Sequence, residues 1–307
     1  AIFALGQLFS PQAEQYLIDA LISEANKQNR LAIIEALGKS GTNKNPDVLK
    51  DFVDSSDPEY QKESAIACGI LAYRGYHPHV LANSLGKLMN NKRDPDISWR
   101  GAYAVYRIGV LRSFNDLTAA MQQNDPLTRY FALKGMEQLV YLMDTPQFKE
   151  YRNQPGIKDL LRLYSSRKFR QLIVEQGQDS TYWYVRLAAV ELMSATKEQS
   201  MQNEIIKRLD DPHPYVKLQA IRSLAKFKNW LTRREMRRIY KETEDWRLKG
   251  EALTVLALVQ PNEALNHVKA DLIDKPWPQN YYAIRTLDSL KTVDPRKKLK
   301  EEKEATE

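Results

Sequence analysis

Short alanine-rich stretches recur along the chain, and apolar side chains return in them every three or four residues. They lie at 1–8, 30–39, 63–72, 100–109, 130–139, 185–193, 216–227, 248–258 and 281–290. This spacing places the apolar side chains on one stripe of an α-helix, and no alternation typical of strands accompanies it. Between the stretches lie more polar segments with a single apolar stripe, among them 11–23, 202–209 and 262–273. Each pair of segments therefore predicts one helical hairpin.

The stretches repeat with a nearly constant period. Aligned on Val185, Val216, Leu248 and Tyr281, they follow one another after 31, 32 and 33 residues. A fixed period of this length is the signature of a solenoid, in which each repeat buries its apolar face against its neighbours. We therefore predict an all-α fold, an α-solenoid of about nine helical hairpins.

Aspartate–proline pairs mark the starts of several predicted helices. An aspartate accepts hydrogen bonds from the free N–H groups at a helix start, and proline fits the first helical position. We expect this arrangement at Asp57, Asp94, Asp125 and Asp211, each of which precedes a proline. Thr232 and Glu235, three residues apart, predict a capping box at the start of a basic helix.

The period is interrupted at residues 141–166, where two prolines and a glycine break helical continuity. We expect short helices near 156–165 and 167–177, and an inserted segment that packs as an ordered cover on the solenoid. The predicted organisation is N-terminal repeats at 1–140, the irregular insertion at 141–166, C-terminal repeats at 167–292 and a charged tail at 293–307. The repeats form one continuous solenoid in this interpretation, and the tail frays.

The predicted turns inside several hairpins resemble those of HEAT repeats. That family places an aspartate in the turn, then a valine and a basic residue five and six positions later. Residues 211–217 match this spacing, residues 94–100 match it with Trp99 in place of valine, and residues 179–186 match it with one extra residue. The resemblance covers nearly the whole chain. It implies a right-handed superhelix whose first helices line the convex surface and whose alanine-rich second helices line the concave surface.

Composition narrows the chemistry. The one cysteine, Cys68, excludes an internal disulfide and a cysteine-based metal site, and its small apolar neighbours predict a buried thiol. His77 and His79 have no carboxylate or third histidine at ligand spacing, so we expect no metal and no cofactor. The motifs of a phosphate-binding glycine loop and of a nucleophile elbow are missing, and we predict no catalytic residue. No run approaches the roughly 18 apolar residues of a membrane helix.

A long repeat surface without a catalytic motif is typical of a scaffold that binds other proteins. The resemblance places partners on the concave surface, and arginine and tyrosine are residues that anchor protein interfaces. The candidate binding residues on second helices are Arg100, Tyr103, Arg107, Arg129, Tyr184, Arg186, Lys217, Arg222, Lys249 and Arg285. For each of them the alternative is a structural role in the packing between repeats.

Positive charge is concentrated in one region. The chain has 46 basic and 39 acidic residues, and residues 207–241 alone contain eleven basic and three acidic ones. Interleaved aromatic residues make nucleic-acid binding the alternative function. The densest run is Arg233, Arg234, Arg237 and Arg238. It falls on a first helix, which the resemblance places on the convex surface, and a solvated helix face is the other explanation.

Two phrases, FALGQL at 3–8 and IEALGKSG at 34–41, resemble bacterial HEAT arrays fused to cyclophilin-type prolyl isomerase domains. The resemblance implies the non-catalytic region of a larger peptidylprolyl isomerase, because this chain lacks an isomerase motif. Residue 1 is alanine and already lies in a predicted helix, so we expect a fragment of a longer chain. A cytoplasmic location fits the sequence, and a periplasmic one fits if an export signal precedes Ala1.

Overall fold

The computed structural model describes residues 1–8, 10–42, 47–146, 148, 155–179, 181–274 and 277–291. Every regular element in these residues is a helix, and no strand occurs among them, which confirms the predicted all-α fold. None of the helices in this part of the chain is long and apolar enough to cross a membrane. The chain forms two compact units, Ala1–Leu192 and Met193–Glu307.

The first unit consists of two layers of helices. The second-helix layer, which carries the alanine-rich stretches, contains α1 (Ile2–Gly6), α3 (Lys27–Ser40), α5 (Pro58–Tyr73), α7 (Pro95–Ile108), α9 (Pro126–Met143) and the first ten residues of α13 (Trp183–Thr196). The first-helix layer contains α2 (Pro11–Ser23), α4 (Asp47–Val53), α6 (Ala82–Met89), α8 (Phe114–Ala120), α11 (Pro155–Tyr164) and α12 (Arg167–Gly177). The 3-10 turns η1 (His79–Leu81) and η2 (Leu111–Ser113) lead into α6 and α8.

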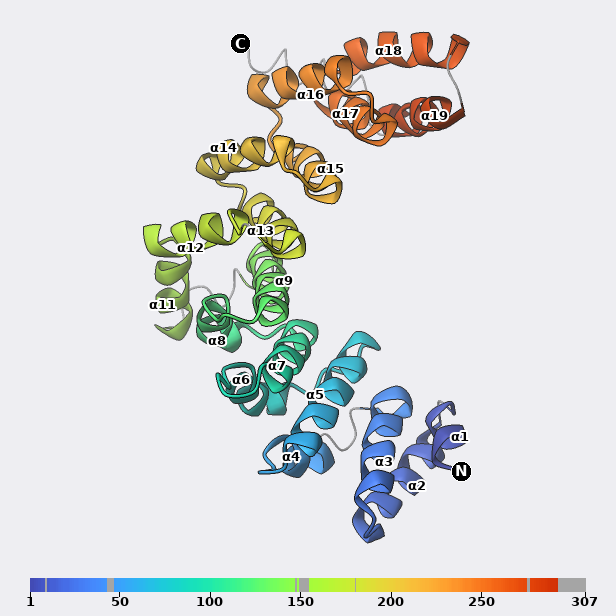
Figure 1. Ribbon diagram of the computed structural model, residues 1–307, viewed down its shortest axis with the longest axis vertical. Helices are drawn as coiled ribbons and strands as arrows, with labels where there is room; N and C mark the ends of the chain where they lie inside the picture. Colours follow the sequence, from blue (N-terminus) through green and yellow to red (C-terminus); the bar gives the residue numbers. More distant parts are fainter. Residues whose placement is uncertain are drawn as a thin grey trace. The chain divides into compact units, whose positions relative to one another are not determined.

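Consecutive second helices of this unit pack side by side, α3 against α5, α5 against α7 and α7 against α9 (Figure 1). Four of the first helices pack on the second helix that follows them, α2 on α3, α4 on α5, α6 on α7 and α8 on α9. Stacked hairpins of this kind make an α-solenoid, because each hairpin buries its apolar faces against its neighbours.

The second unit repeats this arrangement. Its second helices are α15 (Pro214–Leu224), α17 (Trp246–Val259) and α19 (Trp277–Lys291), and its first helices are α14 (Gln199–Lys207), α16 (Trp230–Glu242) and α18 (Pro261–Asp274). The 3-10 turn η3 (Arg208–Asp210) ends α14. α17 packs against α15 and α19 in its own layer and against α16 and α18 in the other. The hairpins of both units confirm the predicted α-solenoid.

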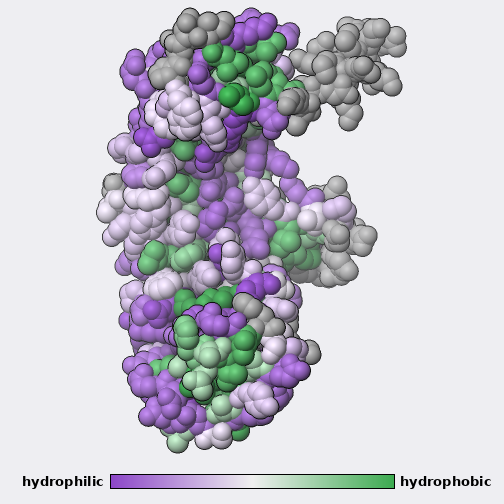
Figure 2. All heavy atoms as spheres, turned by 90° about the vertical axis from the view of Figure 1, so that its right-hand side faces the viewer, coloured by the Kyte–Doolittle hydropathy of each residue, from purple (hydrophilic) through white to green (hydrophobic). Residues whose placement is uncertain are grey.

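The outermost second helices carry exposed apolar side chains. Phe3 on α1 is 76% exposed, and Ile284 on α19 is 60% exposed. Figure 2 shows hydrophobic residues gathered over the N-terminal helices of the first unit and, separately, over the last helices of the second. Within its layer, α1 packs on α3 and α19 packs on α17. The opposite side of each of these two helices faces solvent.

Small residues let helices approach closely, both within the second-helix layer and between the two layers. A Cβ atom on Gly38 of α3 would lie 2.7 Å from the Cα atom of Ala67 on α5, and one on Gly101 of α7 would lie 2.5 Å from the backbone nitrogen of Met89. Both distances are far below van der Waals contact, and the atoms they meet belong to tightly packed backbone. Ala67 itself is fully buried, as is Ala188 of α13. The packing therefore requires glycine or alanine at these positions.

Three of the four aspartates predicted to cap helices do so. Asp57 accepts a hydrogen bond from the N–H of Glu59 at 3.0 Å, Asp94 caps α7 in the same way, and Asp125 caps α9. In each case the following proline occupies the first turn of the helix.

Two predicted helix starts were wrong. The helix expected after Asp211 begins at Pro214, because Asp211 binds the N–H of His213 instead and closes the preceding turn. α16 begins at Trp230 rather than near Thr232, and its cap is Asn229, whose side-chain oxygen accepts from the N–H groups of Leu231 and Thr232. Asparagine at this position offers the same kind of acceptor as a capping threonine, three residues earlier than expected.

The insertion contains helices where they were predicted, since α11 and α12 match the expected segments near 156–165 and 167–177. The rings of Tyr164 and Phe114 pack against the ring of Phe169, with centroid distances of 5.8 and 5.4 Å. The expected cover falls partly on residues 147 and 149–154. These residues and the tail at 293–307 lie outside the described residues.

We expect phenylalanine at Ala67 or Ala188 to overpack the contacts between neighbouring helices. Because both side chains are fully buried, each change should lower the free energy of unfolding by about 1–3 kcal/mol. Urea unfolding followed by circular dichroism measures this loss. Ala270 on α18 is exposed, so Ala270→Phe is the control and should cost less than about 0.5 kcal/mol. Equal stability of the control and the two core variants would contradict the packing.

Candidate functional site

An aromatic cluster lies on the second-helix layer of the first unit, with the ring of Phe131 on α9 at its centre. The ring centroids of Tyr130, Tyr103, Trp99 and Tyr106 lie 5.0, 5.4, 6.2 and 6.3 Å from that of Phe131. Trp99, Tyr103 and Tyr106 come from α7, where steps of four and three residues place them on one face. All five side chains are half-buried, so each keeps part of its surface open to solvent.

A glycine on the neighbouring helix makes room for Tyr103. A Cβ atom on Gly69 of α5 would lie 2.3 Å from Cε1 of the Tyr103 ring, so the ring lies directly over the α5 backbone. Its other side packs edge-on against Phe131 of α9. Tyr103 therefore links three consecutive second helices.

The guanidinium group of Arg107 stacks on three tyrosine rings. Its central carbon lies 4.6 Å from the ring centroid of Tyr73 on α5, 4.9 Å from that of Tyr106 and 5.4 Å from that of Tyr103. A cation over an aromatic face is attracted by the ring quadrupole, so these rings hold the guanidinium in place. Tyr73 is 68% exposed, which leaves this arrangement accessible from outside.

Arg100 lies about two helical turns before Arg107 and also stacks on an aromatic ring. Its guanidinium carbon lies 4.9 Å from the ring centroid of Trp99, and its Nη2 atom lies 3.5 Å from a carboxylate oxygen of Asp96. The structure thus brings Arg100, Tyr103 and Arg107 together on one face of α7.

Tyr184 of α13 extends this surface. Its ring lies edge-on to that of Tyr130 at 5.8 Å, and the rings of Tyr182 and Trp183 pack beside it. Burial raises the pKa of the Tyr184 phenol, so the hydroxyl stays protonated at neutral pH and able to donate a hydrogen bond. We call the surface that α5, α7, α9 and the start of α13 form together the aromatic face.

The sequence pattern did not single out several residues of the aromatic face, namely Tyr73, Trp99, Tyr106, Tyr130 and Phe131. For Trp99 and Tyr106 a signal exists, because their spacing from Tyr103 places them on the same side of a helix. No such signal marks Phe131. Its central place depends on how α9 lies against α7.

Arg129 and Arg186 both bind Asp179, which lies four residues before the start of α13. Arg129 Nη1 lies 2.8 Å from Asp179 Oδ2, and Arg186 Nη1 donates to the Asp179 backbone oxygen at 2.9 Å. The Arg129 side chain is only 14% exposed and Arg186 is buried. These contacts tie α9 to the start of α13, so we assign both arginines a structural role.

In the second unit, a buried carboxylate joins three consecutive second helices. One oxygen of Glu251 on α17 accepts hydrogen bonds from Arg222 of α15 at 2.7 Å and from Arg285 of α19 at 3.0 Å. The Glu251 side chain is 3% exposed, whereas those of Arg222 and Arg285 are 46% and 44% exposed. The two arginines can therefore hold the helices together and still contact solvent.

The two candidate lysines of the second unit lie elsewhere. The Lys249 ammonium group lies 5.1 Å from the ring centroid of Tyr240 on α16, and so contacts the first-helix layer. Lys217 on α15 is half-buried.

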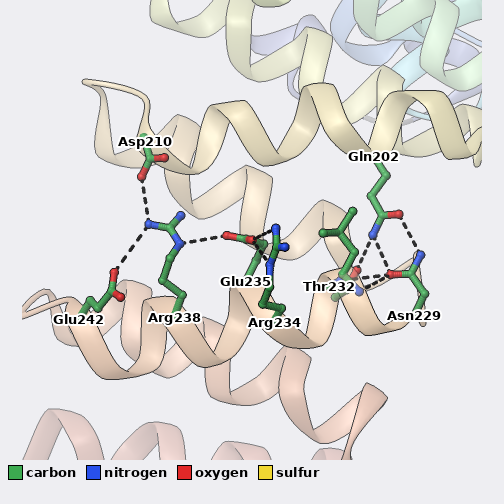
Figure 3. Close-up of polar contacts among 9 residues, drawn as sticks. Gln202, Asp210, Asn229, Thr232, Arg234, Glu235, Arg238 and Glu242 are labelled. Carbon is green, nitrogen blue, oxygen red and sulfur yellow. Dashed lines mark hydrogen bonds and ion pairs between the residues drawn. The ribbon is translucent and has the colours of Figure 1, made fainter.

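Carboxylates engage the basic run on α16 (Figure 3). Glu235, buried on the same helix, accepts from Arg234 at 2.7 Å and from Arg238 at 2.9 Å. Arg238 also approaches Asp210 at 3.5 Å and Glu242 at 3.8 Å. Nearby carboxylates therefore neutralise the positive charges of these two arginines.

One of the other two arginines of the run is also paired with a carboxylate. Arg237 binds both carboxylate oxygens of Glu263 on α18, at 2.6 and 2.5 Å. Arg233 is half-buried. Because nucleic-acid affinity comes mainly from basic groups free to neutralise phosphates, this geometry does not favour the nucleic-acid alternative.

The structure places His77 and His79 side by side and buries Cys68. The rings of His77 and His79 stack with centroids 5.6 Å apart. In the part of the chain that the structure describes, no group of three or more His, Cys, Asp or Glu residues is arranged to hold a metal ion. Cys68 is buried, and burial raises the pKa of its thiol to about 12, too high for a thiolate at neutral pH.

The contacts of Asp179 make part of the stability depend on pH. Burial alone would raise its pKa, but hydrogen bonds from the N–H of Tyr182, from Arg129 and from the N–H of Thr181 outweigh it, and the pKa lies below its usual 3.8. Such a carboxylate contributes stability above its unfolded pKa and loses it as the pH falls through its folded pKa. Asp179→Asn should therefore lower the free energy of unfolding by about 1–3 kcal/mol at pH 7.

The difference between this variant and the original protein should shrink as the pH falls below about 4. Urea unfolding at pH 7 and pH 3 measures it. Asp159 is exposed on α11, and Asp159→Asn is the control, with little effect at either pH. A difference for Asp179→Asn that is the same at both pH values would contradict this account.

We expect Glu251→Gln to loosen the second unit. The change removes the charge that Arg222 and Arg285 share, and both arginines can regain water, so the cost should be about 1–2 kcal/mol in the free energy of unfolding. Arg247→Gln removes the exposed pair with Asp245 and should cost less than about 0.5 kcal/mol. Chemical unfolding of the two variants side by side tests this, and equal stability would show that Glu251 does not join the helices.

Several solved structures match most of the length of this chain. The X-ray structure of Escherichia coli YibA is 13% identical to this chain, with a TM-score of 0.57, and the match covers 94% of this chain and 95% of that one. An engineered protein gives 15% identity, a TM-score of 0.47 and coverage of 81% and 97%. Human deoxyhypusine hydroxylase in complex with glycerol gives 11% identity, a TM-score of 0.36 and coverage of 94% and 98%. At these identities the likeness concerns the fold alone.

A search of curated protein sequences found no match, and the expected link to prolyl isomerases is not confirmed. A family model of HEAT repeats, by contrast, matches residues 1–69, 171–257 and 202–288, which together exceed half of the chain. The hairpin period, the stacked second helices and this match lead to one conclusion, that the chain belongs to the HEAT repeat family.

Proposed function

We propose that this protein is an interaction scaffold that binds a protein partner on the aromatic face of its first unit. The observation that supports the proposal best is the composition of that face, where half-buried tyrosine, tryptophan and phenylalanine rings surround Phe131 and arginines stack on them. Tryptophan, tyrosine and arginine are the residues that dominate binding energy at protein interfaces. HEAT repeats are commonly scaffolds of this kind.

The rigidity of the aromatic face also suits binding. Tyr103 is held between Gly69 and Phe131, and Arg107 is held by three rings. Side chains that are already fixed lose little conformational entropy when a partner docks, so more of the contact energy remains as affinity. Ring hydroxyls at the rim of the cluster supply hydrogen-bond donors.

The candidate binding residues of the second unit have a smaller role in the proposed interface. Arg222 and Arg285 are partly exposed but shared by Glu251. Lys217 and Lys249 are half-buried. We propose that they contribute to the rim of an extended interface rather than to its centre.

The double substitution Tyr103→Ala with Arg107→Glu should abolish partner binding. It removes the ring that links α5, α7 and α9 and reverses a charge stacked on three rings, so we expect affinity to fall by at least about 30-fold. Affinity purification from the source organism, followed by titration of the recovered partner, measures this fall.

A matched variant on the other layer, Arg234→Ala with Arg237→Glu on α16, controls for a general effect of charge and should bind as the original does. Circular dichroism shows whether both variants fold. Equal recovery of every partner by the two variants would exclude the aromatic face. A partner lost only with the α16 variant would move the site to the basic helix, and binding of RNA or DNA at low salt would then support the nucleic-acid alternative.

A further inference from the structure

A pocket of about 430 Å³ lies where α5, α7 and α9 meet the loop after α5. Its walls include Tyr73 from α5, Tyr106 and Arg107 from α7, and Lys134, Glu137 and Tyr141 from α9. Its volume is within the range of roughly 300–1,000 Å³ that is usual for small-ligand sites. The pocket lies beside the aromatic cluster, so a partner docked on the aromatic face would reach it.

Arg107 brings a positive charge to this pocket. Among the described residues, no carboxylate lies within ion-pair distance of its guanidinium group. Its Nε atom is covered and has no hydrogen-bond acceptor. Other cations of the same layer differ in this respect, since Lys62 binds Asp94 and Asp96. The guanidinium of Arg107 contacts aromatic rings instead.

The second cation of the pocket is already balanced. The ammonium group of Lys134 lies 2.5 Å from a carboxylate oxygen of Glu137 and 3.0 Å from one of Glu191. Burial by itself would lower the pKa of Lys134, but these two carboxylates outweigh it and raise the pKa, so the group stays charged. Lys134, Glu137 and Glu191 together carry one net negative charge, and Arg107 is the cation of the pocket that lies away from these carboxylates.

A carboxylate matches this need better than a phosphate does. One carboxylate carries a single charge and can accept two parallel hydrogen bonds from a guanidinium whose plane is already fixed by stacking. A phosphate group brings close to two negative charges near pH 7, and here it would stand beside Glu137. Charge balance therefore favours an acidic amino acid over a phosphopeptide.

We propose that this pocket binds the side-chain carboxylate of an aspartate or glutamate in a segment of the partner protein. Arg107 forms a bidentate ion pair with that carboxylate, and apolar residues on either side of the acidic one pack on Tyr73 and Tyr141. The proposal rests on the proposed function and refines it, because it states the chemistry of the residue that the aromatic face recognises.

Short blocked peptides test this without knowledge of the partner. The probe is acetyl-Ala-Leu-Glu-Leu-Ala-amide, and two twins carry glutamine or phosphoserine at the centre. Titration into the intact ¹⁵N-labelled protein is followed by the side-chain Nε–Hε resonances of arginine. We expect the glutamate peptide to shift the Arg107 resonance and to bind at least about tenfold more tightly than the glutamine twin.

Three variants locate the effect. Arg107→Gln should reduce affinity for the glutamate peptide to that of the glutamine twin. Arg107→Lys should fall between the two, because a lysine keeps the charge but not the planar fork. Arg112→Gln, at an exposed arginine on η2 that does not line the pocket, should leave affinity within about twofold of the original.

The outcomes separate this inference from the proposed function. Three results would overturn the carboxylate site: equal binding of the glutamate and glutamine peptides, no binding of either, or tighter binding of the phosphoserine twin. Each would do so even if the variant Tyr103→Ala with Arg107→Glu still loses a protein partner. Charge-dependent binding that Arg107→Gln removes supports the site, even if that double variant recovers every partner and the proposed function fails.

Discussion

Close contact between consecutive second helices is the constraint on which the rest of this structure depends. Gly38 of α3 lies against the backbone of Ala67 on α5, and Gly69 of α5 lies under the Tyr103 ring of α7, so neither position leaves space for a methyl group. Ala67 and Ala188 are buried completely. Larger side chains at these positions would push the helices apart, and because each hairpin buries its apolar face only against its neighbours, the stack would lose its core.

The same contact determines what the second-helix layer presents outward. With small residues between the helices, larger ones are confined to the outer ridge of each helix, and ridges on adjacent helices come within reach of one another. Trp99, Tyr103 and Tyr106 on α7 meet Phe131 on α9 in this way. The aromatic face is therefore a result of how the hairpins stack and does not need a loop or a cleft to form.

Much of the fold follows from the sequence, because apolar periodicity and a constant repeat length act over short distances. The helix starts were less certain where two residues of similar chemistry compete, as Asn229 and Thr232 do at α16. The basic run on α16 was visible as charge, but its neutralisation by Glu263 involves a residue one repeat away. The contribution of Phe131 likewise depends on a neighbouring helix, so no local pattern predicts it.

Glu251 has a mechanical meaning beyond its part in stability. In repeat arrays each repeat contacts only its neighbours, so the interface between two repeats opens approximately independently of the other interfaces. One carboxylate oxygen of Glu251 accepts hydrogen bonds from Arg222 and from Arg285, so two successive interfaces depend on the same acceptor. Tension that separates α15 from α17 would alter the bond to α19, so this stretch of the protein would respond to force as one spring rather than as two.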